Sequence, residues 1–249
     1  NFFGNKLQVC LSLSNFLSAF GSVGGPFSNL FWLDVMGSAS LQVICGIPAS
    51  PLTYVSYMYL PKLRKRFSTK TLWIASRAVP QLGWTITFLI GINNLDNLWI
   101  MIPALMFAEI CFSSVYSLGK IIPQLMQQEI IDYGEWKTGK RTEAMTSFIS
   151  SLATKLVTQV QNAVSTAVIS FIGYEAGVGT VQSMKTKQAI FAMYTVIPIV
   201  LGIFSYIPML FYDLDDKTKT IMYHELTERR NNIIKKSQEK AIIPATEEK

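Results

Sequence analysis

The sequence predicts an all-α membrane protein with six spans. Half of its 249 residues are hydrophobic, only 15% are charged, and the mean hydropathy is +0.31. A soluble domain of this size would be more polar. The apolar residues fall into six runs, each long enough for the roughly 20 helical residues that cross about 30 Å of hydrocarbon. Each span must satisfy its own backbone hydrogen bonds inside a bilayer, which favours helices over an open sheet.

The six runs follow one another along most of the chain. They cover residues 7–33, 36–59, 72–92, 98–127, 143–173 and 187–212. Helix breakers interrupt the first run, as in the discontinuous helices of transporters; they are Gly21, Gly24, Gly25 and Pro26. We therefore expect a six-helix transmembrane domain at 1–213 and a cytoplasmic tail at 214–249. The tail alternates charged and apolar residues, which is typical of an amphipathic helix.

Basic residues gather in alternate connections between the runs. Five lie between the second and third runs, three between the fourth and fifth, and eight after the sixth. The connections after the first, third and fifth runs hold none, none and two. Lysine and arginine accumulate on the cytoplasmic side of membranes. The sequence thus predicts a multi-pass cell-membrane protein whose C-terminus is cytoplasmic, and the net charge of +6 requires no nucleic-acid partner.

Polar residues inside two of the runs recur at helical spacing. In the fifth run they are Ser151, Lys155, Thr158, Asn162 and Thr166; in the fourth they are Glu109, Ser113, Tyr116, Lys120 and Gln124. Intervals of three and four residues place each set on one face of a helix. Such faces line polar cavities, although hydrogen bonding between neighbouring helices is an alternative explanation for the serines and threonines.

Two lysines lie well inside these runs. A charge at the bilayer centre costs at least ~2.5 kcal/mol, and packing alone gives no reason to accept that cost. Lys120 and Lys155 both lie roughly 15–20 Å from the cytoplasmic connection at 1.5 Å per residue, so they could face one cavity. The alternative is that both side chains extend to the interface. Glu109 lies about three turns from Lys120, so its partner would belong to another helix or be a substrate or cation.

The residues give no sign of enzymatic chemistry. Cys10, Cys45 and Cys111 lie within apolar runs, as small buried side chains do, and the lone His224 belongs to the tail. No span carries a His-Glu-x-x-His motif or a pair of aspartates. We therefore predict no catalytic residues, no metal site and no cofactor, and a membrane-embedded enzyme is a weaker alternative to a transporter.

A charged segment links the fourth and fifth runs and gives the chain a family resemblance. It reads Asp-Tyr-Gly-Glu-Trp-Lys-Thr-Gly-Lys-Arg from Asp132 to Arg141. Together with Lys155 and features of the fifth run and tail, it resembles the glycoside-pentoside-hexuronide:cation symporters, the melibiose-carrier-like branch of the major facilitator superfamily. Those features are Gly173-Tyr174, Tyr212-Asp213-Leu214, Glu225-Leu226 and Arg229-Arg230. The resemblance implies that the chain is the C-terminal half of a twelve-helix transporter and that an N-terminal six-helix half is its partner.

The resemblance also implies roles for particular positions. Lys155 matches a lysine near the junction of sugar and cation sites, and Ser151 matches a hydroxyl residue of the cation site. Asp132 and Arg141 match charged residues that help to hold the outward-facing state. Lys120 stands where the melibiose carrier has a sugar-stacking tryptophan. A second cation beside Lys155 would either pair with carboxylates of the N-terminal half or favour an anionic glycoside, such as a uronide, over a plain galactoside.

These expectations combine into a secondary active transporter. It would carry a sugar or glycoside together with Na⁺ or H⁺ by alternating access, through reciprocal coupling of the two sites. The predicted substrate-binding residues are Lys155, Lys120, Gln159, Asn162 and Tyr116, and the cation-coupling residues are Ser151 and Lys155. The alternative within the same superfamily is a transporter of a lipid or drug. The sequence leaves the sugar, the coupling ion and the oligomeric state open.

Overall fold

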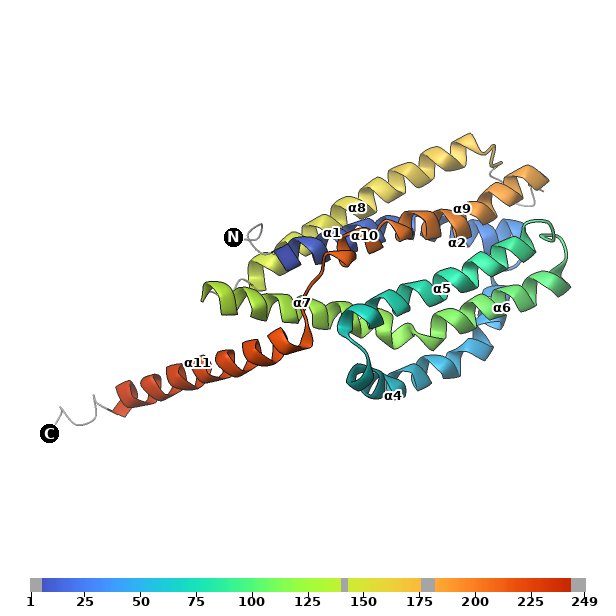
Figure 1. Ribbon diagram of the computed structural model, residues 1–249. Coiled ribbons are helices and arrows are strands. Elements are labelled where there is room, and N and C mark those ends of the chain that lie inside the picture. Colours follow the sequence, from blue (N-terminus) through green and yellow to red (C-terminus); the bar gives the residue numbers. More distant parts are fainter. Residues whose placement is uncertain (1–5, 140–142, 176–181, 243–249) are drawn as a thin grey trace.

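The computed structural model describes residues 6–139, 143–175 and 182–242. All regular structure within these ranges is helical, as predicted. The helices form an elongated bundle, and the C-terminal helix leaves it at the end where the charged segment lies (Figure 1). The connection between residues 91 and 98 lies at the opposite end of the bundle (Figure 1).

The first helical stretch changes helix type along its length. It consists of α1 (Lys6–Phe20), the 3-10 turn η2 (Gly21–Gly24), α2 (Gly25–Leu30) and the π-helical turn η3 (Phe31–Val35). The predicted break at the glycines is thus confirmed. A Cβ at Gly24 would lie 2.6 Å from Pro198 Cγ and 2.9 Å from the Tyr194 carbonyl oxygen. Glycine therefore allows η2 to pack closely against α9 (Met184–Ile203).

The second stretch is bent. It comprises α3 (Ser40–Gly46), η4 (Ile47–Ala49) and α4 (Ser50–Arg66), which extends beyond the predicted limit of residue 59. The helical residues Gly25–Val35 and Ser40–Arg66 meet at 109°. α5 (Thr69–Gly91) follows after an extended Phe67, and the Ser68 hydroxyl caps it by accepting a hydrogen bond from Thr71 N at 3.2 Å.

The charged segment is mostly helix, which corrects the expectation of a connecting loop. α6 (Leu98–Ser114) is followed by α7 (Tyr116–Thr138), which continues well beyond the predicted span end at residue 127. High hydropathy ends near that point, but charged side chains are compatible with a helix in water. α7 ends at Gly139, whose φ of +71° favours glycine. Arg141 lies outside the described residues.

The last helices complete the bundle and the tail. α8 (Glu143–Phe171) is followed by α9, by the short α10 (Tyr206–Leu210) and by α11 (Asp216–Ile242). The Ser183 hydroxyl caps α9 by accepting from Thr186 N at 3.2 Å. Asp215 Oδ1 accepts from Thr218 N at 3.0 Å at the start of α11. The predicted helical tail is confirmed, and the helix continues to Ile242, beyond the expected end at Lys236.

Two apolar clusters fill the bundle. One, near the α11 end, contains the fully buried Trp73, Ile122 and Met126. The other lies toward the opposite end and is centred on Phe31 and Phe191, whose rings stack at 5.3 Å. Close van der Waals packing of this kind holds helices together even where lipid replaces water as the solvent.

Length and hydropathy support only some of the predicted spans independently. Within the described residues, Leu98–Thr138 and Met184–Leu210 are long and apolar enough to cross a membrane. A third span results if the bent pair Gly25–Val35 and Ser40–Arg66 counts as one. Helices occupy all six predicted ranges. The six-span arrangement itself stays a prediction.

Candidate functional site

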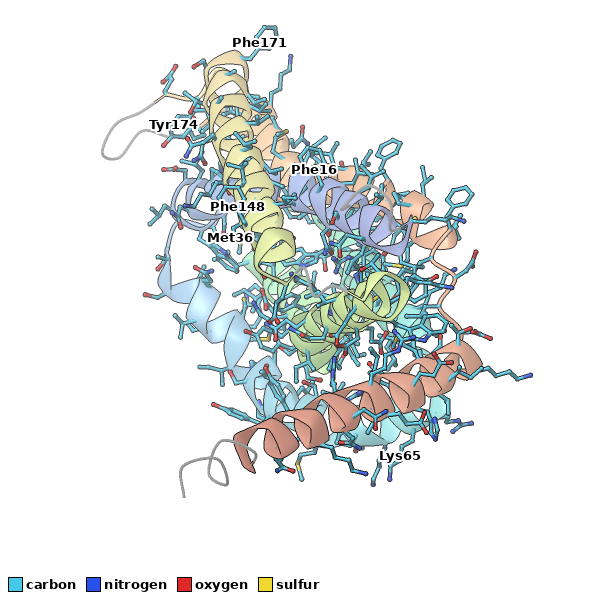
Figure 2. The ribbon with its side chains drawn as sticks, turned by 90° about the vertical axis from the view of Figure 1, so that its left-hand side faces the viewer. Phe16, Met36, Lys65, Phe148, Phe171 and Tyr174 are labelled. Atoms are coloured by element: carbon cyan, nitrogen blue, oxygen red, sulfur yellow. The ribbon has the colours of Figure 1, made fainter. Side chains whose placement is uncertain are left out.

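α8 has one face packed on the bundle and one face open. Its buried side chains are Val157, Gln161 and Ser165, and Gln161 Nε2 donates a hydrogen bond to the Ala19 carbonyl of α1. The residues of the predicted polar face are all exposed; they are Ser151, Lys155, Thr158, Asn162 and Thr166. Figure 2 places α8 at the edge of the bundle, with the labelled Phe148 and Phe171 along it. The polar face of α8 therefore points away from this bundle.

Four predicted site residues share this open face. Lys155, Gln159, Asn162 and Ser151 are all exposed. Lys155 has no hydrogen bond or ion pair with any residue that the structure describes. The ammonium is therefore available to a ligand or to a protein surface beyond this chain.

The other two predicted substrate residues lie on α7 and contact each other. Lys120 is exposed, and its Nζ lies 5.4 Å from the centroid of the Tyr116 ring. Tyr116 makes edge contacts with Tyr57 at 6.4 Å and with Phe112 at 5.7 Å between ring centroids. Sequence reasoning missed both rings: Tyr57 comes from the distant α4, whereas Phe112 lies one turn before Tyr116 and the i, i+4 spacing could have found it. Their exposed rings, at 41% and 43%, extend the candidate site into an aromatic surface beside a cation.

A cavity of about 270 Å³ lies between α1, α7 and α8. Its polar lining comes from all three helices and consists of Ser12, Asn15, Gln127, Ser150 and Thr154. Neither Lys120 nor Lys155 lines it, although Ser150 and Thr154 flank Ser151 on α8. The structure thus places neutral hydrogen-bonding groups, rather than charges, inside this part of the bundle.

The predicted gating residue Asp132 is paired within this chain. Arg230 of α11 donates from Nη2 to Asp132 Oδ1 at 3.1 Å and to Glu135 Oε2 at 2.8 Å. The hydrogen bonds to Glu135 and Asp132 raise the pKa of the Arg230 guanidinium above its ordinary value. Asp132 is therefore held near the C-terminal end of α7 by the tail helix, a contact that the sequence did not predict.

Further polar and apolar contacts attach α11 to the bundle. Trp136 Nε1 donates to Glu225 Oε2 at 2.7 Å, and Arg229 Nη1 donates to the Trp136 carbonyl at 3.0 Å. The side chains of Met222 and Leu226, both on α11, are buried. The tail helix thus docks onto the charged segment of α7 through its motif Glu225-Leu226 and Arg229-Arg230.

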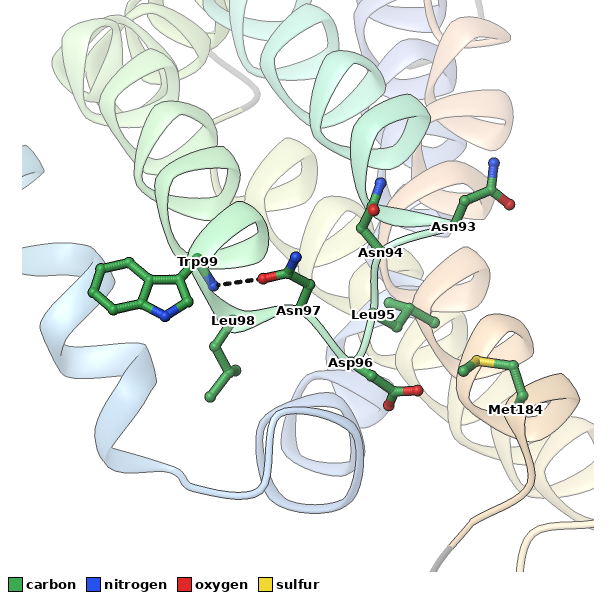
Figure 3. Close-up of a pocket in the computed structure, with 8 residues that line it drawn as sticks. All are labelled: Asn93, Asn94, Leu95, Asp96, Asn97, Leu98, Trp99 and Met184. Carbon is green, nitrogen blue, oxygen red and sulfur yellow. Dashed lines mark hydrogen bonds between the residues drawn. The ribbon is translucent and has the colours of Figure 1, made fainter.

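A separate pocket of about 590 Å³ lies at the opposite end of the bundle (Figure 3). It is lined by the connection between α5 and α6 and by one residue of α9: Asn93, Asn94, Leu95, Asp96, Asn97, Leu98, Trp99 and Met184. Asn97 Oδ1 accepts from Trp99 N at 3.2 Å and caps α6. An ion pair of 2.7 Å between Lys187 and Asp96 joins this connection to α9. None of the predicted site residues lies here.

The described residues can provide polar recognition. In the described ranges, no group of three or more histidine, cysteine, aspartate or glutamate side chains could hold a metal ion. The predicted site residues of α7 and α8 offer two ammonium groups, amides, a hydroxyl and an aromatic ring. These groups can bind hydroxyl-rich and negatively charged molecules by hydrogen bonds and ring contacts.

The chain matches known proteins over most of its length. The family model of MFS/sugar transport proteins matches residues 3–216. YjmB, an uncharacterized symporter of Bacillus subtilis, is 26% identical over 174 residues, which are 68% of this chain and 35% of that protein. A provisionally assigned sulfoquinovose importer of Escherichia coli is 24% identical over 199 residues, 79% of this chain and 40% of that protein.

A shorter match adds a third named relative. The isoprimeverose transporter of Lactiplantibacillus pentosus is 36% identical over 91 residues, which are 36% of this chain and 19% of that protein. The matched part of this chain thus spans 40% or less of the length of each of these three relatives.

Proposed function

Because this chain belongs to the MFS/sugar transport protein family, we propose that it is the C-terminal half of a secondary transporter for a sugar or glycoside. The observation that carries this proposal is the open polar face of α8. Its predicted site residues are exposed on this chain, and Lys155 has no partner among the described residues. A binding site formed with an N-terminal six-helix half accounts for both facts.

The physical reason is the cost of leaving such a face in lipid. A charged side chain within a span almost always faces the interior of a bundle or a water-filled cavity. Lys155 and its polar neighbours cannot face the interior of this bundle, because Val157, Gln161 and Ser165 occupy that side of α8. They therefore require a second protein surface or an aqueous pathway next to it. Transporter halves provide both at their interface near the midplane.

The two predicted site cations, Lys155 on α8 and Lys120 on α7, favour an acidic sugar as the substrate. Lys120 and Lys155 are both exposed, and Lys120 lies against the ring of Tyr116. A carboxylate or sulfonate would form charge-assisted hydrogen bonds with one ammonium, while the sugar hydroxyls would bind Gln159 and Asn162. One relative is described as an importer of sulfoquinovose, a sulfonated sugar. Acidic glycosides are therefore the first substrates to test.

Coupling and gating complete the proposed cycle. Ser151 and Lys155 are the proposed link between the sugar and the coupled Na⁺ or H⁺, because they lie one helical turn from each other on the open face. Asp132 is proposed to act at the cytoplasmic gate with Arg141. The ion pair between Arg230 and Asp132 supports a role for the tail helix in positioning that carboxylate.

Uptake by the full-length transporter tests this proposal. Lys155→Ala should lower accumulation of a labelled acidic glycoside about tenfold to a hundredfold, because a hydrogen bond to a charged group contributes about 1.5–3 kcal/mol. The matched control is Lys185→Ala, which removes an exposed lysine near the start of α9 and should leave uptake unchanged. Near-normal accumulation by Lys155→Ala would remove this residue from the proposed site.

A further inference from the structure

A second titratable group lies inside the bundle, and the proposed site does not use it. Glu109 is in the middle of α6, within the apolar helical stretch Leu98–Thr138. Its side chain is half-buried. It has no hydrogen bond and no ion pair with any residue of the described ranges. A carboxylate in this position needs a compensating partner, because an isolated charge is costly in an apolar environment.

The elements around α6 do not supply a positive charge. The electrostatic neighbours of Glu109 are the Cys45 thiol of α3 and the Tyr194 hydroxyl of α9. The cation on the adjacent α5, Arg77, lies instead over the Trp73 ring, 4.0 Å from its centroid, and its titratable neighbour is Tyr206. The lysines and arginines of α4 and the start of α5 lie at the cytoplasmic end, at residues 62–70. Within the described residues, no cation therefore balances Glu109.

A cavity of about 330 Å³ lies against Tyr194, a residue that is electrostatically coupled to Glu109. Phe112, one turn along the same face of α6, and Tyr194 both line it. The broken first helix forms another wall through Gly21, Gly24 and Gly25. Discontinuous helices are features of ion and substrate pathways.

A proton can balance the charge of Glu109 without a coordination shell, whereas a hard cation is held by several oxygen ligands. A proton needs only the carboxylate itself, and its binding removes the charge that is costly to bury.

We propose that Glu109 is a proton-binding residue of the transport cycle. The carboxylate takes up one proton to become a neutral carboxylic acid, and it returns that proton when the site opens to the other side of the membrane. This inference rests on the proposed transport function and adds to it a coupling group on this half. It also gives a role to the part of α6 that the substrate site leaves unused.

Glu109→Gln in the full-length transporter tests the proposal, because glutamine mimics the protonated acid. Proton-driven accumulation should fall at least tenfold and lose its pH dependence, whereas equilibrium exchange of substrate should change by less than threefold. Glu109→Asp should restore part of the accumulation. The control Glu228→Gln, in the exposed tail helix, should behave as the parent does. An unchanged pH profile and an unchanged ratio of protons to substrate in Glu109→Gln would overturn the proposal.

An infrared titration separates failure of this inference from failure of the proposed function. The purified full-length protein should show a carboxylic acid C=O band that titrates and is missing from Glu109→Gln, whether or not any sugar is transported. Absence of that band from the parent protein would overturn the inference even if glycoside uptake were observed. Presence of the band without any glycoside uptake would support Glu109 as a proton site while refuting the sugar assignment.

Discussion

Lys219→Ala should release α11 from the bundle. Lys219 Nζ lies 2.9 Å from Glu129 Oε2 and donates to Thr69 Oγ1 at 3.0 Å, and the Thr69 hydroxyl donates to Glu129 Oε1 at 3.3 Å. The lysine and glutamate side chains are only 11% and 12% exposed. The substitution would leave the Glu129 carboxylate nearly buried without the positive charge that now faces it.

The expected loss lies between the values for surface and buried ion pairs. Removing one partner of a buried pair costs about 3–5 kcal/mol, whereas an exposed pair contributes about 0.2–1 kcal/mol. The low exposure of both side chains places this pair near the buried case, and we expect a loss of roughly 2–3 kcal/mol in α11 docking. The undocked population should then rise roughly 30- to 140-fold. Replacing both Lys219 and Glu129 by methionine should recover most of the loss, since no unpaired charge remains.

Hydrogen exchange of α11 peptides in the full-length protein measures this population. Faster exchange should be confined to the tail helix and to the ends of α5 and α7 that contact it. The control Glu228→Gln removes the exposed pair between His224 and Glu228 and should change exchange less than twofold. The reasoning would be refuted by a change below threefold in Lys219→Ala, or by a double variant that opens α11 as much as the single one.

Two further predictions concern backbone packing and pH. Gly24→Ala should lower the free energy of unfolding by about 1–3 kcal/mol, because the new Cβ would meet Pro198 and the backbone of α9. The control Gly25→Ala places its Cβ in open space and should not lower it. Equal melting temperatures for the two variants would contradict this prediction. Hydrogen bonds from the Thr218 side chain and backbone lower the pKa of Asp215 below 3.8. The Asp215 carboxylate therefore stabilises the start of α11 above pH 3.8, and this stabilisation is lost as the pH falls through the lower pKa of the folded state. If the Thr218 amide stayed protected from exchange after Asp215 is protonated, the prediction would be contradicted.

Hydropathy and helical spacing predicted the elements and the open face, for a physical reason. The intervals between Ser151, Lys155 and Asn162 fix a common face of any helix, whatever surrounds it. The exposure of these side chains in the structure agrees with that prediction. The glycines at 21–25 were recognisable as a break, because few other residues allow such a close approach of two helices.

The helical structure of the charged segment and its contact with α11 could not be predicted in the same way. Hydropathy reports whether a segment suits lipid, so it ended the fourth run at residue 127 although the helix continues to Thr138. The contact of Arg230 with Asp132 joins residues 98 positions apart and depends on how α11 docks. Tyr57 likewise meets Tyr116 only after α4 and α7 have packed. Such contacts are set by tertiary structure and leave no periodic pattern in the sequence.

Gradient-driven uptake by the full-length transporter in sealed vesicles tests the central claim most directly. A labelled acidic glycoside should accumulate above its external concentration when an inward H⁺ or Na⁺ gradient is imposed, and it should flow out when that gradient is collapsed. Uptake that only equilibrates, at the same rate with and without any cation gradient, would contradict coupled transport through the open face of α8.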